Sequence, residues 1–518
     1  MEFNKMKKMK RKKVLGCLNI LMFLSVLTAC SSNDSSTEAP TANTGSGYVW
    51  STDGGLKACN HILFNNGVAD STGSDIGNGD QEFVFTGNQT LKKGTYNLKG
   101  WVYIANGATL TIQPGAIIKG DKATKAALIA ERGGKLYAQG TVNAPIIFTS
   151  AQAKGNRKPG DWGGIILCGK AKNNQTEMQI EGGPRTKHGG NDDSDNSGSL
   201  EYVRIEFAGY PFETNREING LTFGSVGSGT TIDHIQVSYS NDDSYEWFGG
   251  SVSCKYLIAY HGWDDDFDTD DGFSGKVQFG LAIRDPKIAD LSQSNGFESD
   301  NCADGSTVEP YTTATFSNMT LVGPKYGDHN FQNSSSYITG GNMNPNNGSS
   351  LGKFQAAMQI RRNSRLNCYN SIAIGWPIGL LLDNQKGDTQ GAATKGLLKI
   401  QHVWFSSMDV NGSDANNSYL DERVTGYDGN AQPIYDATQK SFSCSWFNQQ
   451  LGNKAFADVT SLNLINGYMP AAGSPVLNEA SFDGLASWFT KVNYIGAFGN
   501  GDDWMTGWTN FDPENTDY

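Results

Sequence analysis

The chain repeats a short apolar triplet through its middle: Ile235-Gln236-Val237, Tyr256-Leu257-Ile258 and Phe279-Gly280-Leu281. Counted from their first residues, the triplets lie 21 and then 23 positions apart, with turns rich in Asn, Asp and Gly between them. A run this short between turn formers favours a strand over a helix. Repeats of about 20 to 30 residues with short strands are typical of a parallel β-helix, in which each coil buries its apolar face against its neighbours.

The same pattern extends in both directions from this stretch. Similar apolar bursts occur at 109–112, 135–137, 372–374 and 403–405. The wide gap between Phe279 and Met319 predicts a loop inserted on one face. An antiparallel sandwich would instead require tight Asn-Gly hairpins between successive strands, and few are present. We therefore predict an all-β chain, with a parallel β-helix over 48–473 and a segment over 474–518 that covers an open end of the solenoid.

The first residues are typical of a bacterial lipoprotein signal. Seven basic residues lie between Lys5 and Lys13, an apolar run follows from Val14 to Val26, and Leu27-Thr28-Ala29-Cys30 ends the segment. The apolar run is too short to span a bilayer as a helix. We predict a signal peptide over 1–29, lipid attachment at Cys30 and a flexible, polar tether over 30–47. The alternative is an ordinary signal peptide that happens to contain a cysteine.

The charge balance limits the possible partners. The full chain has 41 basic and 53 acidic residues, and residues 1–29 hold seven of the basic and one of the acidic residues. Residues 30–518 therefore hold 34 basic and 52 acidic residues, a formal charge of −18. Such a negative chain is a poor partner for nucleic acid. Cys168, Cys254 and Cys368 lie inside apolar strand patterns, and we predict buried free thiols there.

Two acidic turns, Asn241–Trp247 and Trp263–Gly272, point to a cation site. The second turn places six carboxylates in eight consecutive positions. Asp242 and Asp264 lie 22 positions apart, about one coil, so the two turns would stack about 4.8 Å apart. Calcium is bound by six to eight oxygens, and stacked carboxylates would repel each other without a cation. The predicted calcium ligands are Asp242, Asp243, Glu246, Asp264, Asp265, Asp266, Asp268, Asp270 and Asp271. A solvated acidic loop, with aspartates capping turn amides, is the alternative.

Residues beside these turns are candidates for ligand contact or catalysis. Trp247 and Trp263 could stack on sugar rings, and Arg284 follows the second turn by about one coil. In a calcium-dependent lyase the metal would neutralise a uronate while Arg284, Lys255 or Lys276 removed a proton. A hydrolase with two of the aspartates as acid and base is a further alternative.

Other motifs carry less information about function. The acidic loop His188–Asn196 could bind a cation or simply turn. We interpret His234 and His402 as packed polar residues within strands, and His261 is notable because it precedes the second acidic turn. The chain has no nucleophile elbow, no His-Glu-x-x-His and no phosphate-binding glycine loop.

Several of these motifs together resemble a family, the right-handed parallel β-helix surface lipoproteins of Bacteroidota. The resemblance covers about Gly94 to the C-terminus. Besides the two acidic turns and the ending Tyr494–Phe511, it rests on Gly107-Ala108-Thr109-Leu110-Thr111-Ile112-Gln113-Pro114-Gly115, Asp161-Trp162-Gly163-Gly164-Ile165-Ile166, the segment from Asp195 to Ile205, and Asn295-Gly296-Phe297-Glu298-Ser299-Asp300-Asn301. It implies a right-handed coil and a location at the cell surface, and it assigns no catalytic residue.

Taken together, the sequence predicts a lipoprotein of the outer membrane, anchored by lipid and facing the cell exterior. We expect it to bind an extracellular ligand such as a glycan on a calcium-stabilised acidic face, or to serve as an accessory to a surface transporter complex. The alternatives are a calcium-dependent polysaccharide lyase or glycosidase and a structural or adhesive surface protein.

Overall fold

The computed structural model describes residues 48–50, 56–58, 64–65, 68–69, 75–81, 83–175, 178–180, 183–213 and 216–518. The chain divides into two units, Met1–Thr41 and Ala42–Tyr518, and all the described residues belong to the second. The predicted signal peptide, Cys30 and the tether lie outside the described residues. No helix among the described residues is long and apolar enough to cross a membrane.

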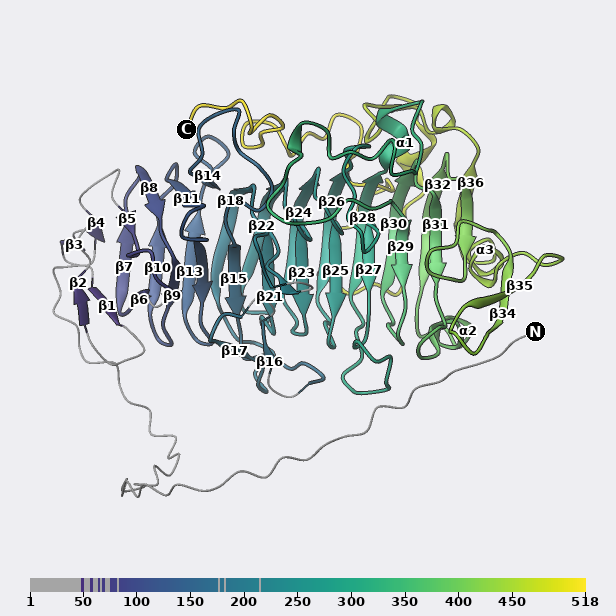
Figure 1. Ribbon diagram of the computed structural model, residues 1–518. Helices are drawn as coiled ribbons and strands as arrows, with labels where there is room; N and C mark the ends of the chain where they lie inside the picture. The colour runs from purple at the N-terminus through teal and green to yellow at the C-terminus, as the bar shows by residue number, and fades with distance from the viewer. Residues whose placement is uncertain are drawn as a thin grey trace, which may run out of the picture. The chain divides into compact units, whose positions relative to one another are not determined.

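Two long parallel sheets form a right-handed parallel β-helix, which confirms the predicted fold (Figure 1). The larger, sheet 1, includes β7 (Asn88–Leu91), β10 (Thr109–Ile112), β13 (Lys135–Gln139), β18 (Gly198–Glu206), β22 (Thr231–Ser238), β24 (Ser253–Tyr260), β26 (Lys276–Ile283), β28 (Thr315–Val322), β30 (Asn367–Ile374), β32 (Ile400–Ser406) and β36 (Lys454–Phe456). The smaller, sheet 2, consists of β6 (Phe83–Phe85), β9 (Trp101–Ile104), β12 (Ala127–Ala130), β15 (Gly164–Cys168), β21 (Leu221–Gly224), β23 (Tyr245–Phe248), β25 (Phe267–Asp270), β27 (Phe297–Ser299), β29 (Ala356–Ile360), β31 (Ile378–Leu382) and β33 (Val410–Ser413).

The chain alternates between the two sheets once in each coil. It leaves β22 in sheet 1, forms β23 in sheet 2, and returns to β24, which pairs in parallel with β22. The repeating triplets lie on neighbouring strands, although the first two are offset by one residue: Ile235 pairs with Leu257, and Leu257 pairs with Gly280. Wider sequence gaps hold loops, as predicted, and the largest of them separates β28 from β29.

Each long strand of sheet 1 bends at one residue with a left-handed backbone. These residues are Tyr202, His234, Tyr256, Phe279, Asn318, Asn370 and His402, with φ between 49° and 64°. The strand registers place them in one column along the coil. A left-handed conformation costs about 1–2 kcal/mol for a residue other than glycine. The packing of every coil against the next must therefore hold this corner in place.

The side chains of this column are covered by the end of the chain, residues 479–518, which we call the C-terminal strap. The strap runs along the coils in the opposite order to the chain, since Ser481 lies at Asn370 and Asn510 lies at Gln236. Buried amide side chains hold it through paired hydrogen bonds. Gln236 Nε2 donates to the Asn510 carbonyl at 2.7 Å, and the Asn510 amide donates to Gln236 Oε1 at 2.9 Å. Gln278 binds Thr490 in the same way.

The strap lies along the flank of the solenoid, which differs from the expected cover over an open end. The last coil is instead covered by α3 (Phe442–Phe447), which lies beyond β31 and β32 in Figure 1. Phe447 stacks on Phe405 with ring centroids 4.1 Å apart, and the Leu382 amide donates to Ser443 Oγ. An exposed apolar end needs such a cover, and a helix with Trp446 and Phe447 on one side supplies it.

Several of the predicted residues are packed, some inside the coil and some beneath the segments that cover its outer faces. Cys168, Cys254 and Cys368 are buried free thiols, as predicted. His234 packs between Tyr202 and Tyr256, with ring centroids 4.4 and 4.3 Å away, which confirms it as a packed residue.

Candidate functional site

The two acidic turns lie on neighbouring coils, as the spacing predicted. Strand β23 pairs in parallel with β25, so that Tyr245 is opposite Phe267 and Glu246 is opposite Asp268. The Asp265 amide donates a hydrogen bond of 2.8 Å to Asp243 Oδ1. The aspartates before the two strands are therefore direct neighbours.

A ladder of side-chain acceptors explains why the turns stack in this way. Asp243 accepts the Asp265 amide, Asp265 accepts the Asn295 amide, and Asn295 accepts the Ala356 amide at 3.0 Å. Each side-chain oxygen thus satisfies a backbone donor in the following coil, which a buried amide requires. An Asp or Asn at this position has a structural role independent of any ligand.

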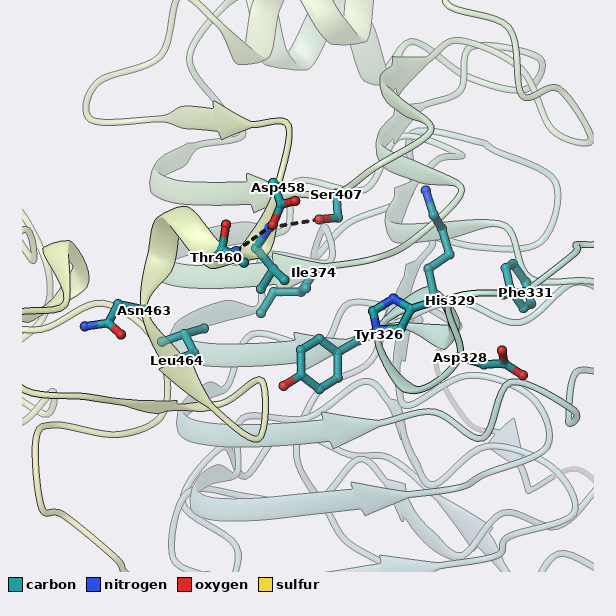
Figure 2. Close-up of a pocket in the computed structure, with 12 residues that line it drawn as sticks. Tyr326, Asp328, His329, Phe331, Ile374, Ser407, Asp458, Thr460, Asn463 and Leu464 are labelled. Atoms are coloured by element: carbon teal, nitrogen blue, oxygen red, sulfur yellow. Dashed lines mark hydrogen bonds between the residues drawn. The ribbon is translucent and has the colours of Figure 1, made fainter.

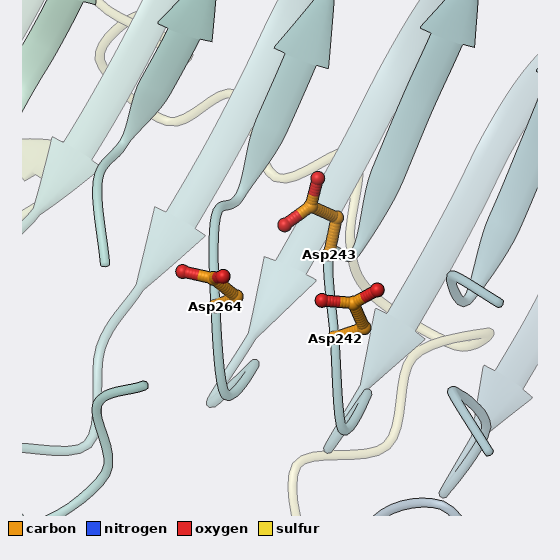
Figure 3. Close-up of side chains that lie close together, drawn as sticks. All are labelled: Asp242, Asp243 and Asp264. Carbon is orange, nitrogen blue, oxygen red and sulfur yellow. The ribbon is translucent and has the colours of Figure 1, made fainter. Parts of the chain in front are cut away.

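Five carboxylates of these turns converge to form the acidic cluster: Asp242, Asp243, Glu246, Asp264 and Asp268. They make two triads that share Asp243, one with Asp242 and Asp264 and the other with Glu246 and Asp268. Within each triad, one oxygen of every residue lies within 4.8 Å of the others. Figure 3 shows Asp242 and Asp243 on one turn and Asp264 on the turn beside it.

Burial and mutual repulsion disfavour the ionised form of Asp243 and Asp268 and raise their pKa values. Burial raises the pKa of Asp243 well above its ordinary value, and the charges of Asp242 and Asp265 raise it further. Burial also raises the pKa of Asp268, to which Glu298 adds. A cation bound among these oxygens would relieve both effects.

The donor set fits a hard cation such as Ca²⁺. All the converging atoms are carboxylate oxygens, the ligand type that calcium prefers. Two buried oxygens, Asp264 Oδ1 and Asp268 Oδ1, have no hydrogen-bond partner among the described residues. Buried acceptors are normally satisfied, so these two oxygens are suited to a metal bond.

Asp266 and Arg284, both predicted at the site, form a buried ion pair instead. Their side chains have no exposed surface, and Arg284 Nη1 lies 2.9 Å from Asp266 Oδ1. Arg284 also donates to the carbonyls of Trp263 and Asp264. Burial raises the pKa of Asp266 to about 6, although Arg284 opposes the shift. The predicted roles of Asp266 as a metal ligand and of Arg284 in ligand contact are therefore wrong.

The predicted aromatic contacts are also wrong, because both tryptophans are buried. Trp247 belongs to the core, where its ring stacks on Phe223 and Phe273 with centroids 5.2 and 5.3 Å away. Trp263 is 1% exposed and packs with Ile288 and Met343. Neither ring offers a face to a sugar.

The remaining predicted ligands lie outside the two triads. Asp265 is buried within the acceptor ladder, and its charge acts on Asp243. Asp270 and Asp271 lie at the far end of β25, and the Asp271 amide donates to Asp270 Oδ1 at 2.6 Å. Asp270 lies two positions after Asp268 along the strand, a separation of roughly 7 Å between their backbones. It therefore lies away from the triads.

The structure adds residues that sequence reasoning missed. Glu298 continues the row of Glu246 and Asp268 on the next strand, and Arg361 pairs with it and with Asp300. The sequence does contain a pattern that indicates Glu298. Each of the three strands begins with an aromatic residue followed by an acidic one: Tyr245-Glu246, Phe267-Asp268 and Phe297-Glu298. The insertion before β27 obscured the spacing.

The other candidate bases lie away from the acidic cluster. Lys255 and Lys276 belong to β24 and β26 of sheet 1, whereas the cluster lies at β23 and β25 of sheet 2. Lys255 donates to Thr490 of the C-terminal strap at 2.8 Å. His261 lies 3.3 Å from the Tyr239 hydroxyl and 4.0 Å from Asp285. This geometry does not bring a free base to the triads from any of these three residues.

The acidic loop His188–Asn196 is organised by internal contacts. Asp193 pairs with Lys172 at 2.6 Å, and Asp195 accepts the Lys170 amide at 3.0 Å. His188 is fully buried beside Ser225, and burial lowers its pKa to about 3. Of the two alternatives open for this loop, the contacts favour a turn.

One known protein family matches the coil. The sequence model of a family described as a pectate-lyase-like β-helix domain matches residues 84–449, which is most of the chain. Comparison with curated proteins and with solved structures gives no match. The matched range includes both acidic turns and every strand from β9 to β33. The chain therefore belongs to the pectate-lyase-like β-helix domain family.

Proposed function

We propose that the protein is a lipid-anchored surface protein that binds an acidic glycan through Ca²⁺ held in the acidic cluster. The observation that carries this proposal is the pair of carboxylate triads that share Asp243. Three protein carboxylates fill only part of a calcium coordination shell of six to eight oxygens. The remaining positions are suited to the carboxylate and hydroxyl oxygens of a uronic acid.

Charge explains why a cation would be needed. A formal charge of −18 for residues 30–518 repels a polyanionic glycan unless a cation bridges the two. Calcium supplies this bridge when bound, while Asp243, Glu246 and Asp268 hold it at the surface of sheet 2. The family's β-helix is consistent with a role in polysaccharide recognition.

Binding is favoured over cleavage because the basic side chains near the acidic cluster are already engaged in ion pairs. An elimination would require a free base next to the metal. Arg284 is fully buried against Asp266, and Arg361 is paired with Glu298 and Asp300. Both guanidinium groups are therefore engaged in holding the fold.

We expect calcium to stabilise the protein and to control glycan binding. Calcium at 100 times its dissociation constant would add about 2.7 kcal/mol to the free energy of unfolding. Calorimetric titration should give a saturable heat, and the melting temperature should fall after chelation. The protein should bind polygalacturonate in calcium and release it in chelator, with neutral dextran as the control polymer. Absence of both the heat and the melting shift would refute the metal site, and release of unsaturated uronate products would replace binding with lyase activity.

The lipid anchor is a separate part of the proposal and rests on the sequence of the signal. With the natural chain expressed in a bacterial host, Cys30→Ser should abolish incorporation of labelled fatty acid and release the protein from the membrane fraction. Cys17→Ser, which changes the other cysteine of the leader, should leave both unchanged. Labelled lipid on the Cys30→Ser variant would contradict the assignment.

A further inference from the structure

A cavity lies on a different part of the solenoid from the acidic cluster, where strands of sheet 1 end. It has a volume of about 620 Å³ and is bounded by two segments, 325–331 after β28 and 458–464 after β36 (Figure 2). Ile374, at the end of β30, is fully buried at its floor. The acidic cluster contributes no residue to it.

The ring of Tyr326, which lines this cavity, is held in place by the backbone of Gly467. Tyr326 belongs to α1 (Pro324–Gly327), and its amide donates to the Gly323 carbonyl. Gly467 packs against the ring so closely that a Cβ there would lie 2.7 Å from two ring carbons. With φ +80°, Gly467 also has a backbone that suits glycine. Tyr326 is thereby held in the wall of the cavity, beside His329 in Figure 2.

Two carboxylates line the cavity, Asp458 and Asp328, together with side chains that can also donate: Lys325, Tyr326, His329, Ser407, Thr460 and Asn463. Asp458 accepts the Thr460 amide at 2.8 Å, and this bond, with a contribution from His329, lowers the pKa of Asp458. A hydrogen bond from Tyr337 likewise lowers the pKa of Asp328. Both groups are ionised at neutral pH and act only as acceptors.

The main cationic group in the wall is already engaged. Lys325 Nζ lies 2.5 Å from Asp409 Oδ1. Two carboxylates without a spare ammonium group repel an anionic ligand, whereas hydroxyl groups can donate to them. Figure 2 shows the two carboxylates on different sides of the cavity, Asp458 beside Thr460 and Asp328 beyond His329. A fixed ring with acceptors around it suits an apolar-faced, hydroxyl-rich molecule.

We propose that this cavity binds one ring of a neutral glycan, with the sugar face against Tyr326 and its hydroxyls donating to Asp458 and Asp328. The site is distinct in chemistry from the acidic cluster, because it needs no metal and selects against negative charge. The protein would then recognise two kinds of sugar at two places along one solenoid.

The test uses the full mature chain on an array of neutral and uronic-acid oligosaccharides, followed by calorimetry with the neutral oligosaccharide that binds best. We expect binding that persists in chelator. Tyr326→Ala and Asp458→Asn should each weaken it by at least about tenfold, the loss expected for one ring contact or one charge-assisted hydrogen bond. Tyr326→Phe should retain it, since the ring remains.

A control variant and a second cavity variant separate loss of the sugar site from a general effect on the protein. Asp436→Asn is the control, because Asp436 is a partly exposed aspartate that accepts the amide two residues on, as Asp458 does, but lies outside the cavity. If Tyr326→Ala fails to fold, Asp458→Asn still tests the site. Failure to bind any neutral oligosaccharide, or unchanged affinity in Asp458→Asn and Tyr326→Ala, would overturn the proposal. Loss of neutral-sugar binding on chelation would also overturn it and would assign the sugar to the acidic cluster.

Discussion

Replacement of Arg284 by methionine should lower the free energy of unfolding by about 3–5 kcal/mol, the cost of leaving one partner of a buried ion pair alone. Arg284 has no exposed side-chain surface and donates to Asp266, to the Asp264 carbonyl and to the Trp263 carbonyl. Methionine fills a similar volume but satisfies none of these acceptors. The loss should appear as a lower midpoint in urea denaturation, monitored by tryptophan fluorescence.

A double variant separates the ion pair from simple packing. Adding Asp266→Leu to Arg284→Met removes the stranded carboxylate, so the double variant should recover much of the lost stability. Arg423→Met, at an exposed arginine of β34 (Arg423–Tyr427), should change stability by less than about 0.5 kcal/mol. An Arg284→Met variant as stable as the wild type would mean that the pair is solvated, contrary to its burial.

The repeat predicted the coil because each strand contacts mainly the next one. The order of β22, β24 and β26 follows from the spacing of the triplets, whereas the register does not, because Ile235 pairs with Leu257 and not with Tyr256. The C-terminal strap could not be predicted in the same way. Gln236 meets Asn510 across 274 positions, and a single buried amide leaves no periodic signal in the sequence.

The candidate site was predicted in position but only partly in composition. Stacking of the two turns followed from their spacing, whereas the direction of each side chain required the two-residue period of the strand. Within β23, Glu246 lies between Tyr245 and Trp247, both in the core, so the glutamate faces outward. Applied to the sequence, this alternation would have excluded Trp247. The ion pair of Asp266 with Arg284 joins residues in consecutive coils, and no pattern within either coil marks it.

Asp243→Asn should remove calcium binding and, with it, binding of the acidic glycan. Asp243 belongs to both triads, so one substitution takes a charge from each. Mutation of residues that only support the metal ligands typically lowers metal affinity by about 10–100-fold. Loss of a ligand shared by both triads should therefore lower calcium affinity by at least about 100-fold. Asparagine can still accept the Asp265 amide through Oδ1, so the backbone ladder should persist.

The same substitution should have opposite effects on stability with and without the metal. In chelator, Asp243→Asn should melt at a higher temperature than the wild type, because it removes a buried carboxyl whose pKa is raised by burial and by neighbouring charges. In saturating calcium it should melt lower, because the metal no longer binds. Asp285→Asn is the matched control: burial raises the pKa of Asp285 too, but this residue belongs to neither triad and should leave the calcium response intact. If the melting temperature of Asp243→Asn rises with calcium as much as that of the wild type, the acidic cluster is not the calcium site, and the stacked turns serve only to join the coils.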